Sequence, residues 1–303
     1  MNALRIRKLG SNLLGTVALT AGIALAGTAT AADVKPYQGI PADQAESISS
    51  PDHIMSVVNS GAPTEIWQAL EHGEVVECLQ CIGVVSPLLY SSNAKNREIA
   101  AWWLRRRIFG VFGPGEVYSQ TVDTLASDSS ATRRADAASA LGEFLVLNGV
   151  APVAHALTSD TDPGVRAAAA SALGRLNDDG AGALAKAFSD SDATVRVAAF
   201  QAAGKVNSFT DVSSAVAVTG DSNALVRRVG IELLDAMGAT DAAEAVLKLA
   251  QTDPDSEVRL VSCHALGAIG DPSMVSELQA ISTNDTNQQV QDQAAIAVLR
   301  LTR

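Results

Sequence analysis

Apolar and polar residues along this chain follow a sequence motif that repeats about every thirty residues. In each copy an acidic or polar turn leads into an arginine. An alanine-rich helical run follows, and it closes on Leu-Gly or a similar pair seven and eight residues later. The markers are Arg134, Arg166, Arg196, Arg227 and Arg259, with Gln291 in the same place in a last copy and Arg97 in an earlier, less regular one. The steps between the regular copies are 32, 30, 31, 32 and 32 residues. A repeat of this size predicts stacked pairs of helices.

Helical periodicity predicts one helix before each turn and one after it. First helices are expected near 116–126, 150–158, 181–188, 210–218, 241–251 and 272–281. Second helices are expected near 132–146, 164–176, 194–206, 224–237, 256–268 and 287–301. Carboxylates in the turns can accept hydrogen bonds from the unpaired N–H groups that begin each second helix. Upstream, residues 51–73 predict two short helices that cap the array, which we expect to span 74–303.

The motif is most complete in three copies: Val165-Arg166 with Ala172-Leu173-Gly174, Val195-Arg196 with Ala202-Ala203-Gly204, and Val258-Arg259 with Ala265-Leu266-Gly267. Over about residues 90–303 this pattern resembles the HEAT-repeat family, particularly the short subtype found in phycobilin lyases and deoxyhypusine hydroxylase. The resemblance implies an all-α fold, a right-handed α-solenoid of about six to seven stacked helix pairs. It implies little about activity. The repeated His-Glu pairs that hold the hydroxylase di-iron centre are missing here, and nothing beyond the repeat supports lyase chemistry.

The repeated arginine is interpreted as structural, because a charge that occurs once per repeat seldom belongs to one active site. A carboxylate stands four residues before it in three copies, as Asp162, Asp192 and Asp255. A guanidinium fork can bind a carboxylate with two parallel hydrogen bonds. We therefore expect an inter-repeat ladder in which each arginine binds a carboxylate of its own or the neighbouring repeat.

The N-terminal residues follow a different pattern. Three basic residues precede an uncharged apolar run from Leu9 to Ala26, and Ala29-Thr30-Ala31 has the small-residue form of a cleavage site. These features predict a secretory signal peptide over 1–31, followed by a flexible leader over 32–50, and an exported protein that is periplasmic or extracellular. Cleavage would change the net charge from −11 to −14. That charge disfavours nucleic acid as a partner, and no later run is long enough to span a membrane.

Cys78 and Cys81 share the spacing of structural disulfides, redox pairs, zinc sites and haem-attachment sites. Ile82 stands where haem attachment needs histidine, and zinc lacks a second pair of ligands. No strand pattern supplies the surroundings of a thioredoxin-like site. In an exported protein the spacing favours a structural disulfide, with redox exchange or a metal as alternatives. Cys263 falls on an apolar core position and is expected to be a buried free thiol. We expect no cofactor.

The fifth residue after each arginine should point outward, because the core positions lie at one before and three, six, seven and ten after. These residues form a chemically mixed row: Trp102, Ser139, Ser171, Gln201, Glu232, His264 and Ile296. Trp102 is also followed by Arg105, Arg106 and Arg107, the only dense basic cluster outside the signal peptide. Tryptophan and arginine supply much of the binding energy at protein interfaces. The four residues are therefore candidates for partner binding, although they could equally pack and solvate their own helix.

No hydrolytic triad motif, phosphate-binding loop or metalloprotease motif occurs in the chain. The leading hypothesis is an exported, non-enzymatic protein-binding or scaffolding solenoid, a monomer or a part of a hetero-complex, that binds through its second-helix face. The alternative is a redox or lyase-type accessory that acts through Cys78 and Cys81 on a cofactor-bearing exported protein. The identity of the partner does not follow from the sequence.

Overall fold

The computed structural model describes residues 47–108, 115–177 and 179–303. Within these ranges the chain forms sixteen α-helices, α2 to α17, and no strand. The expected signal peptide and most of the expected leader lie outside the described residues. None of the described helices is long and apolar enough to cross a bilayer.

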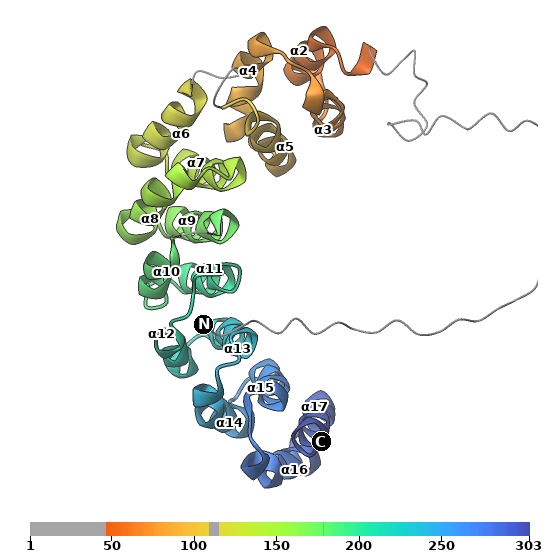
Figure 1. Cartoon of the computed structure of the whole chain (residues 1–303), viewed down its shortest axis with the longest axis vertical. Coiled ribbons are helices and arrows are strands. Elements are labelled where there is room, and N and C mark those ends of the chain that lie inside the picture. Colours follow the sequence, from red (N-terminus) through yellow and green to blue (C-terminus); the bar gives the residue numbers. More distant parts are fainter. Residues whose placement is uncertain (1–46, 109–114, 178) are drawn as a thin grey trace, which may run out of the picture. The chain divides into compact units, whose positions relative to one another are not determined.

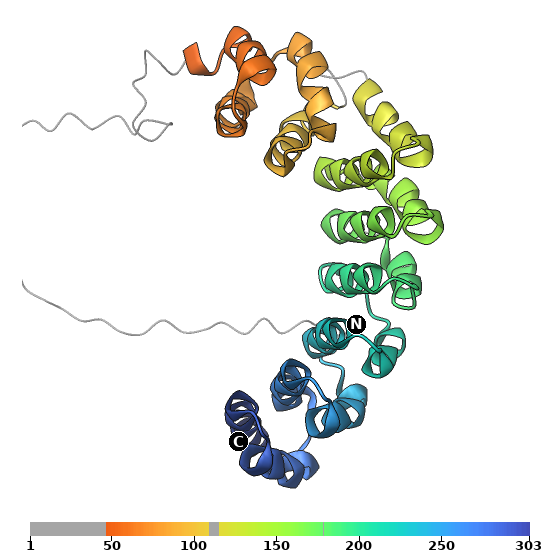
Figure 2. The same ribbon diagram turned by 180° about the vertical axis from the view of Figure 1, so that it is seen from behind.

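The helices from residue 116 onward form six pairs, as predicted, and the all-α solenoid is confirmed (Figure 1). The first helices are α6 (Glu116–Ser127), α8 (Val150–Ser159), α10 (Ala181–Ala187), α12 (Val212–Val216), α14 (Ala243–Thr252) and α16 (Val275–Asn284). The second helices are α7 (Ala131–Phe144), α9 (Pro163–Leu176), α11 (Ala193–Ala203), α13 (Ala224–Ala236), α15 (Ser256–Ile269) and α17 (Gln288–Leu301). Each second helix packs on the next one, and the same neighbours can be followed from behind in Figure 2.

The N-terminal helices are α2 (Pro51–Ser60), α3 (Pro63–His72), α4 (Leu79–Val85) and α5 (Ala94–Leu104). Two 3₁₀ segments complete this part, η1 (Gly73–Val75) between α3 and α4 and η2 (Ser86–Tyr90) directly after α4. Helix α2 packs on α3 and α4, and α3 packs on α5. These contacts continue the apolar core from the pairs into residues 51–73.

The second helices begin where a turn side chain caps them. Asp162 Oδ1 accepts from the N–H groups of Gly164 at 2.8 Å and Val165 at 3.2 Å. Asp192, Asn223, Asp255 and Asn287 cap their helices in the same way. A side-chain oxygen at this position satisfies N–H groups that lack a partner inside the helix. The residues four before each arginine are thus helix caps.

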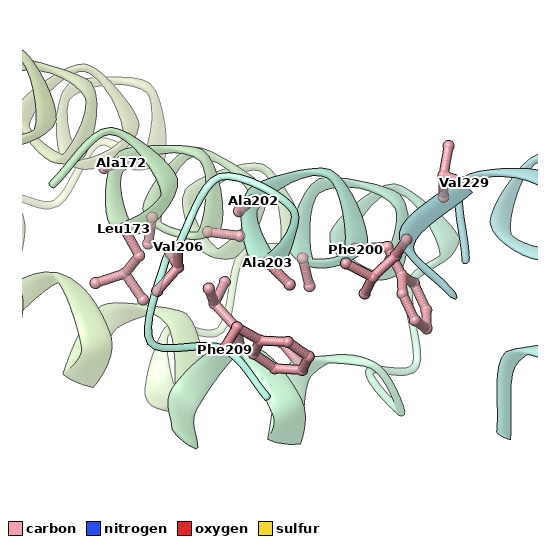
Figure 3. Packing of buried hydrophobic residues seen from close by; sticks show 14 of the residues in the cluster. Ala172, Leu173, Phe200, Ala202, Ala203, Val206, Phe209 and Val229 are labelled. Atoms are coloured by element: carbon pink, nitrogen blue, oxygen red, sulfur yellow. The ribbon is translucent and has the colours of Figure 1, made fainter. Parts of the chain in front are cut away.

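Small residues allow the second helices to approach one another closely. A Cβ atom added to Gly142 would lie 2.8 Å from Ala172 Cα, and one added to Gly174 would lie 3.0 Å from Ala202 Cα. Where α10 and α12 are short, aromatic rings fill the core. Phe188 stacks on Phe200 with centroids 3.9 Å apart, and Phe209 tilts against Phe188 at 5.4 Å. Figure 3 shows Leu173, Val206 and Phe209 on the same side of α9 and α11.

One predicted first helix is shorter than the pattern suggested. The segment predicted at 210–218 is α12, which spans only five residues and continues as the 3₁₀ segment η5 (Ala217–Gly220). Gly220 ends this segment before Asp221. The apolar periodicity marks the buried positions of this segment without distinguishing an α-helix from a tighter 3₁₀ turn.

Candidate functional site

Each repeat arginine joins the turns of two successive repeats. Arg166 donates from Nε and Nη2 to the two carboxylate oxygens of Asp190, each at 2.7 Å, and from Nη1 to the Asp160 carbonyl at 3.0 Å. Asp190 belongs to the next turn along the chain, and the Asp160 carbonyl belongs to the turn before α9. The same fork joins Arg134 to Asp160, Arg196 to Asp221, Arg227 to Asp253 and Arg259 to Asp285.

The partner carboxylates are not those four residues before each arginine. Asp162, Asp192 and Asp255 cap their own helices, so their oxygens serve backbone N–H groups. The partners lie six residues before the next arginine, or before Gln291 in the last copy. Each partner also accepts from the N–H group two residues later, as Asp190 does from Asp192 at 2.9 Å. The turn is therefore held by the same carboxylate that receives the neighbouring arginine.

The ladder changes at both ends. Gln291 keeps only the bond to its own turn, donating to the Asp285 carbonyl at 2.6 Å. Arg97 donates to the Ser91 carbonyl at 2.6 Å, but its ion pair is with Asp136 on α7, at 2.9 Å, rather than with a turn aspartate. The five regular arginines use their charge inside the array, so they are not available for a ligand.

The ladder predicts a loss of stability in acid. The Arg134 hydrogen bond lowers the pKa of Asp160, and the Arg259 hydrogen bond lowers that of Asp285. A carboxyl with a lowered folded-state pKa stabilises the fold above its unfolded value, about 3.9, and loses that contribution as the pH falls through the folded value. We expect the free energy of unfolding, measured with denaturant, to change little between pH 7 and 5 through these groups and to fall below about pH 4. A fall already complete at pH 5 would contradict this role.

Cys78 and Cys81 are joined by a disulfide with an S–S distance of 2.03 Å. Cys78 is 3% exposed and Cys81 is fully buried. Cys78 also caps α4, since its Sγ accepts from the Cys81 N–H at 3.1 Å. A thiol that exchanges with this bond must reach a sulfur in line, which the surrounding core prevents without local opening. The geometry therefore favours a structural bond over the redox alternative.

The remaining cysteine is equally enclosed. Cys263 lies in the core of α15, and burial raises the pKa of its thiol to about 12. A buried thiol with a raised pKa carries little thiolate and is a poor nucleophile or metal ligand. Among the described residues, no group of three or more histidine, cysteine or acidic side chains is placed to hold a metal ion.

The disulfide predicts resistance to mild reductant. In the native protein at pH 8, about 1 mM dithiothreitol should leave the Cys78–Cys81 bond intact in a thiol-alkylation mass measurement, because both sulfurs are buried. The double variant Cys78→Ala, Cys81→Ala should lose less than about 2 kcal/mol of unfolding free energy, since a bond between residues three apart closes a short loop. Rapid, reversible cycling in the native state would instead support the redox alternative.

The structure corrects one member of the predicted partner-binding cluster. Arg107 is 7% exposed, and its guanidinium lies 3.6 Å from the Trp103 ring centroid. Its Nη2 donates to the carbonyls of Glu74 at 2.6 Å and Val76 at 2.8 Å, and its Nη1 donates to the Trp103 carbonyl at 2.7 Å. Burial, with Arg106 nearby, lowers the Arg107 pKa to about 10. Arg107 thus ties η1 and the residues after it to the end of α5 and presents no charge to a partner.

The other three residues of the cluster lie near the surface and are called the Trp102 surface below. Trp102 is half-buried, and the Arg105 guanidinium lies 5.5 Å from its ring centroid. Arg106 is exposed and pairs with Glu74 at 2.9 Å. No ion pair of Arg105 is seen within the described ranges, and its charge acts on the nearby Glu143 carboxyl. An aromatic ring beside an unpaired cation is a suitable contact for an acidic or aromatic group.

The row at the fifth position after each arginine lies on the surface. Its members Ser139, Ser171, Gln201, Glu232, His264 and Ile296 are all exposed, and Trp102 is half-buried. His264 Nδ1 lies 3.2 Å from Gln293 Nε2, and its Nε2 lies 3.7 Å from an oxygen of Asp235. The row therefore presents a mixture of polar, charged and apolar side chains at regularly spaced positions.

A sequence model of HEAT repeats matches residues 118–204, 150–220 and 212–299. The chain belongs to the HEAT-repeat family. A search of curated proteins found no match.

Two solved structures share this fold at low sequence identity. The Escherichia coli protein YibA is 18% identical with a TM-score of 0.56, covering 85% of this chain and 95% of its own. Kap121p bound to Pho4p is 13% identical with a TM-score of 0.58, covering 86% of this chain but 34% of its own. The CpcE–CpcF phycocyanin lyase of Nostoc sp. PCC7120 is 20% identical with a TM-score of 0.40, covering 72% of this chain and 86% of its own. The first two likenesses concern the fold alone, and no activity is transferred from any of the three.

The HEAT repeat formed by α12 and α13 departs from its neighbours at one contact. Eight residues after the arginine, Gly142, Gly174 and Gly267 lie against the next second helix, whereas α13 has Asp235. A carboxylate cannot be enclosed between helices without a partner. Asp235 is instead partly exposed beside the row, with a carboxylate oxygen 3.7 Å from Nε2 of His264 in the next HEAT repeat. The second-helix face is therefore least regular at α13 and α15.

Proposed function

We propose that this chain is an exported, non-enzymatic HEAT-repeat scaffold that binds another protein through its second-helix face and the Trp102 surface. One observation carries the proposal. The repeated arginines and the thiols are used inside the fold, while six of the seven members of the fifth-position row are exposed and range from serine and glutamine to glutamate, histidine and isoleucine. A rigid frame with a varied surface suits recognition of one particular protein surface better than a repeating polymer.

The proposal places no chemistry on the chain. The disulfide is buried, Cys263 is enclosed, and the ladder arginines are bound to aspartates. A catalytic group needs access to its substrate and a partner that activates it. On the second-helix face, the exposed His264 and the Asp235 carboxylate lie 3.7 Å apart, which is longer than a hydrogen bond. Binding is the role that these side chains support.

Site-specific cross-linking tests which face binds. A photo-crosslinking amino acid at Ser171 or Gln201 on the second-helix face should trap one protein in the native host. The same amino acid at Thr158 on α8 is the control, since Thr158 is also exposed but lies on a first helix. Equal cross-linking to one protein from both faces, or trapping from Thr158 alone, would refute the assignment of the face.

Charge reversal tests the Trp102 surface with the trapped partner in purified form. The double variant Arg105→Glu, Arg106→Glu should raise the dissociation constant of the complex at least about tenfold, as loss of a central interface arginine does. Lys186→Glu on α10 is the matched control, being an exposed basic residue on a first helix. An unchanged dissociation constant in the Arg105 and Arg106 variant would remove this surface from the interface.

Export is a separate part of the proposal. The mature protein recovered from the native host should begin near Ala32, lack residues 1–31 and be found outside the cytoplasm. N-terminal sequencing with cell fractionation measures both properties. A chain that keeps Met1 and remains in the cytoplasm would overturn the export proposal and leave the binding proposal standing.

A further inference from the structure

The junction between α4–η2 and α6 contains a groove of about 690 Å³. Of the later first helices, α6 packs on α8 and α8 packs on α10. Here α4 continues as η2 with Pro87 in its first turn, and η2 packs on α5 and α7. Among the described residues, the groove lies between η2 and α6 on the first-helix side.

The groove is lined mainly by apolar groups. Ile82, Tyr90 and Val117 are half-buried along it, and Leu79 is 59% exposed at its edge. Gly83 also lines it, and a Cβ atom added there would meet no atom within 4 Å. An exposed leucine beside a preformed apolar hollow is typical of a surface that receives another apolar side chain.

The two charged side chains that line the groove, Arg133 and Glu116, differ in whether they have an ion-pair partner. Arg133 is already engaged, because its guanidinium stacks 4.1 Å from the Tyr90 ring centroid and pairs with Asp128 at 2.8 Å. Glu116 is exposed and receives only a neutral donor, Gln120 Nε2, at 3.0 Å. Within the described residues no cation pairs with Glu116. The available charge is therefore negative, in a chain whose net charge is −11.

We propose that this groove binds a short segment of another protein that places an apolar side chain between Ile82 and Val117 and a lysine or arginine near Glu116. The apolar contact supplies burial, and the cation complements the one unpaired lining charge. This site lies on the first-helix side, so it does not depend on the second-helix face proposed above. It would give the scaffold a second contact, with a basic and apolar segment.

Gly83 makes the proposal testable without disturbing the core. Gly83→Leu should fill the groove, and it should not lower the melting temperature, because its Cβ meets open space and leucine favours helix over glycine. Gly182→Leu on α10 is the matched control, since Gly182 also has no atom within 4 Å of an added Cβ. Glu116→Lys tests the charge, with Glu244→Lys on α14 as an exposed control.

The probe is a displayed library of random seven-residue peptides, selected on the full wild-type chain. Recovered peptides should combine a large aliphatic residue with lysine or arginine. Their affinity should fall at least about tenfold in Gly83→Leu and in Glu116→Lys and stay unchanged in both controls. The proposal is overturned if no peptide is enriched, if enriched peptides bind Gly83→Leu as well as wild type, or if they are acidic. Self-association of the chain that Gly83→Leu abolishes would assign the groove to a second copy and also overturn it.

Discussion

Replacing Arg227 with alanine is expected to lower the free energy of unfolding by about 3–5 kcal/mol, which is the cost of removing one partner of a buried ion pair. The Arg227 and Asp253 side chains are 9% and 2% exposed, which makes this the most enclosed of the five regular ladder pairs. The truncation would leave the Asp253 carboxylate in the core with only the Asp255 N–H at 2.9 Å. An uncompensated buried charge costs more than the pair itself contributes.

The measurement is denaturant unfolding of the purified array at pH 7. Arg166→Ala is the matched control, because Arg166 and Asp190 are 13% and 12% exposed and water can reach the remaining carboxylate more readily. The loss in Arg166→Ala should therefore be smaller. The double variant Arg227→Met, Asp253→Leu should recover part of the loss, since it removes both charges. Equal and small losses in both single variants would show that the ladder contributes little stability.

Replacing Gly142 with alanine is expected to destabilise the array by about 2–3 kcal/mol, although alanine usually favours a helix. The added Cβ would lie 2.8 Å from Ala172 Cα and 2.9 Å from Ala172 Cβ. No rotamer change relieves a contact with the backbone, so α7 and α9 must move apart. That displacement would loosen the contact on which the next repeat is stacked.

Gly204 provides the comparison at the same repeat position. Its added Cβ would first meet Leu233 Cδ1 at 3.7 Å, an ordinary contact distance. Gly204 is the C-cap of α11 with a φ of −64°, which alanine also adopts, so Gly204→Ala should be neutral or stabilise by up to about 1 kcal/mol by restricting the unfolded chain. Thermal unfolding of the two variants side by side measures the contrast. A loss in Gly204→Ala as large as in Gly142→Ala would show that helix spacing does not cause the effect.

The helix pairs were predictable because each repeat carries its own local signals. A capping side chain begins each second helix, and apolar residues at helical spacing identify its buried face. The predicted and observed pairs agree from α6 to α17, apart from the short α12 with η5. The inter-repeat role of the arginines was also predictable, because a charge that returns with the repeat indicates a contact between repeats.

The aspartate that each repeat arginine binds was not predictable from local signals. Two acidic residues stand in the turns that precede α9, α11 and α15, two positions apart, and only the stacking shows which one faces the previous arginine. The burial of Arg107 was not predicted. Because α5 ends at Leu104, the direction of the Arg107 side chain no longer follows the helical period. The groove beside Gly83 depends on how η2 packs on α5 and α7, which no local pattern encodes.

The sequence alone therefore determined the repeat, the helix pairs and the outward row, because those properties depend on residues close together in the chain. The tertiary structure decided which carboxylate binds each repeat arginine. It also decided that Arg107 is buried and where the groove beside Gly83 lies. These depend on contacts between residues about 25 or more positions apart, whose distances are set only when neighbouring repeats stack.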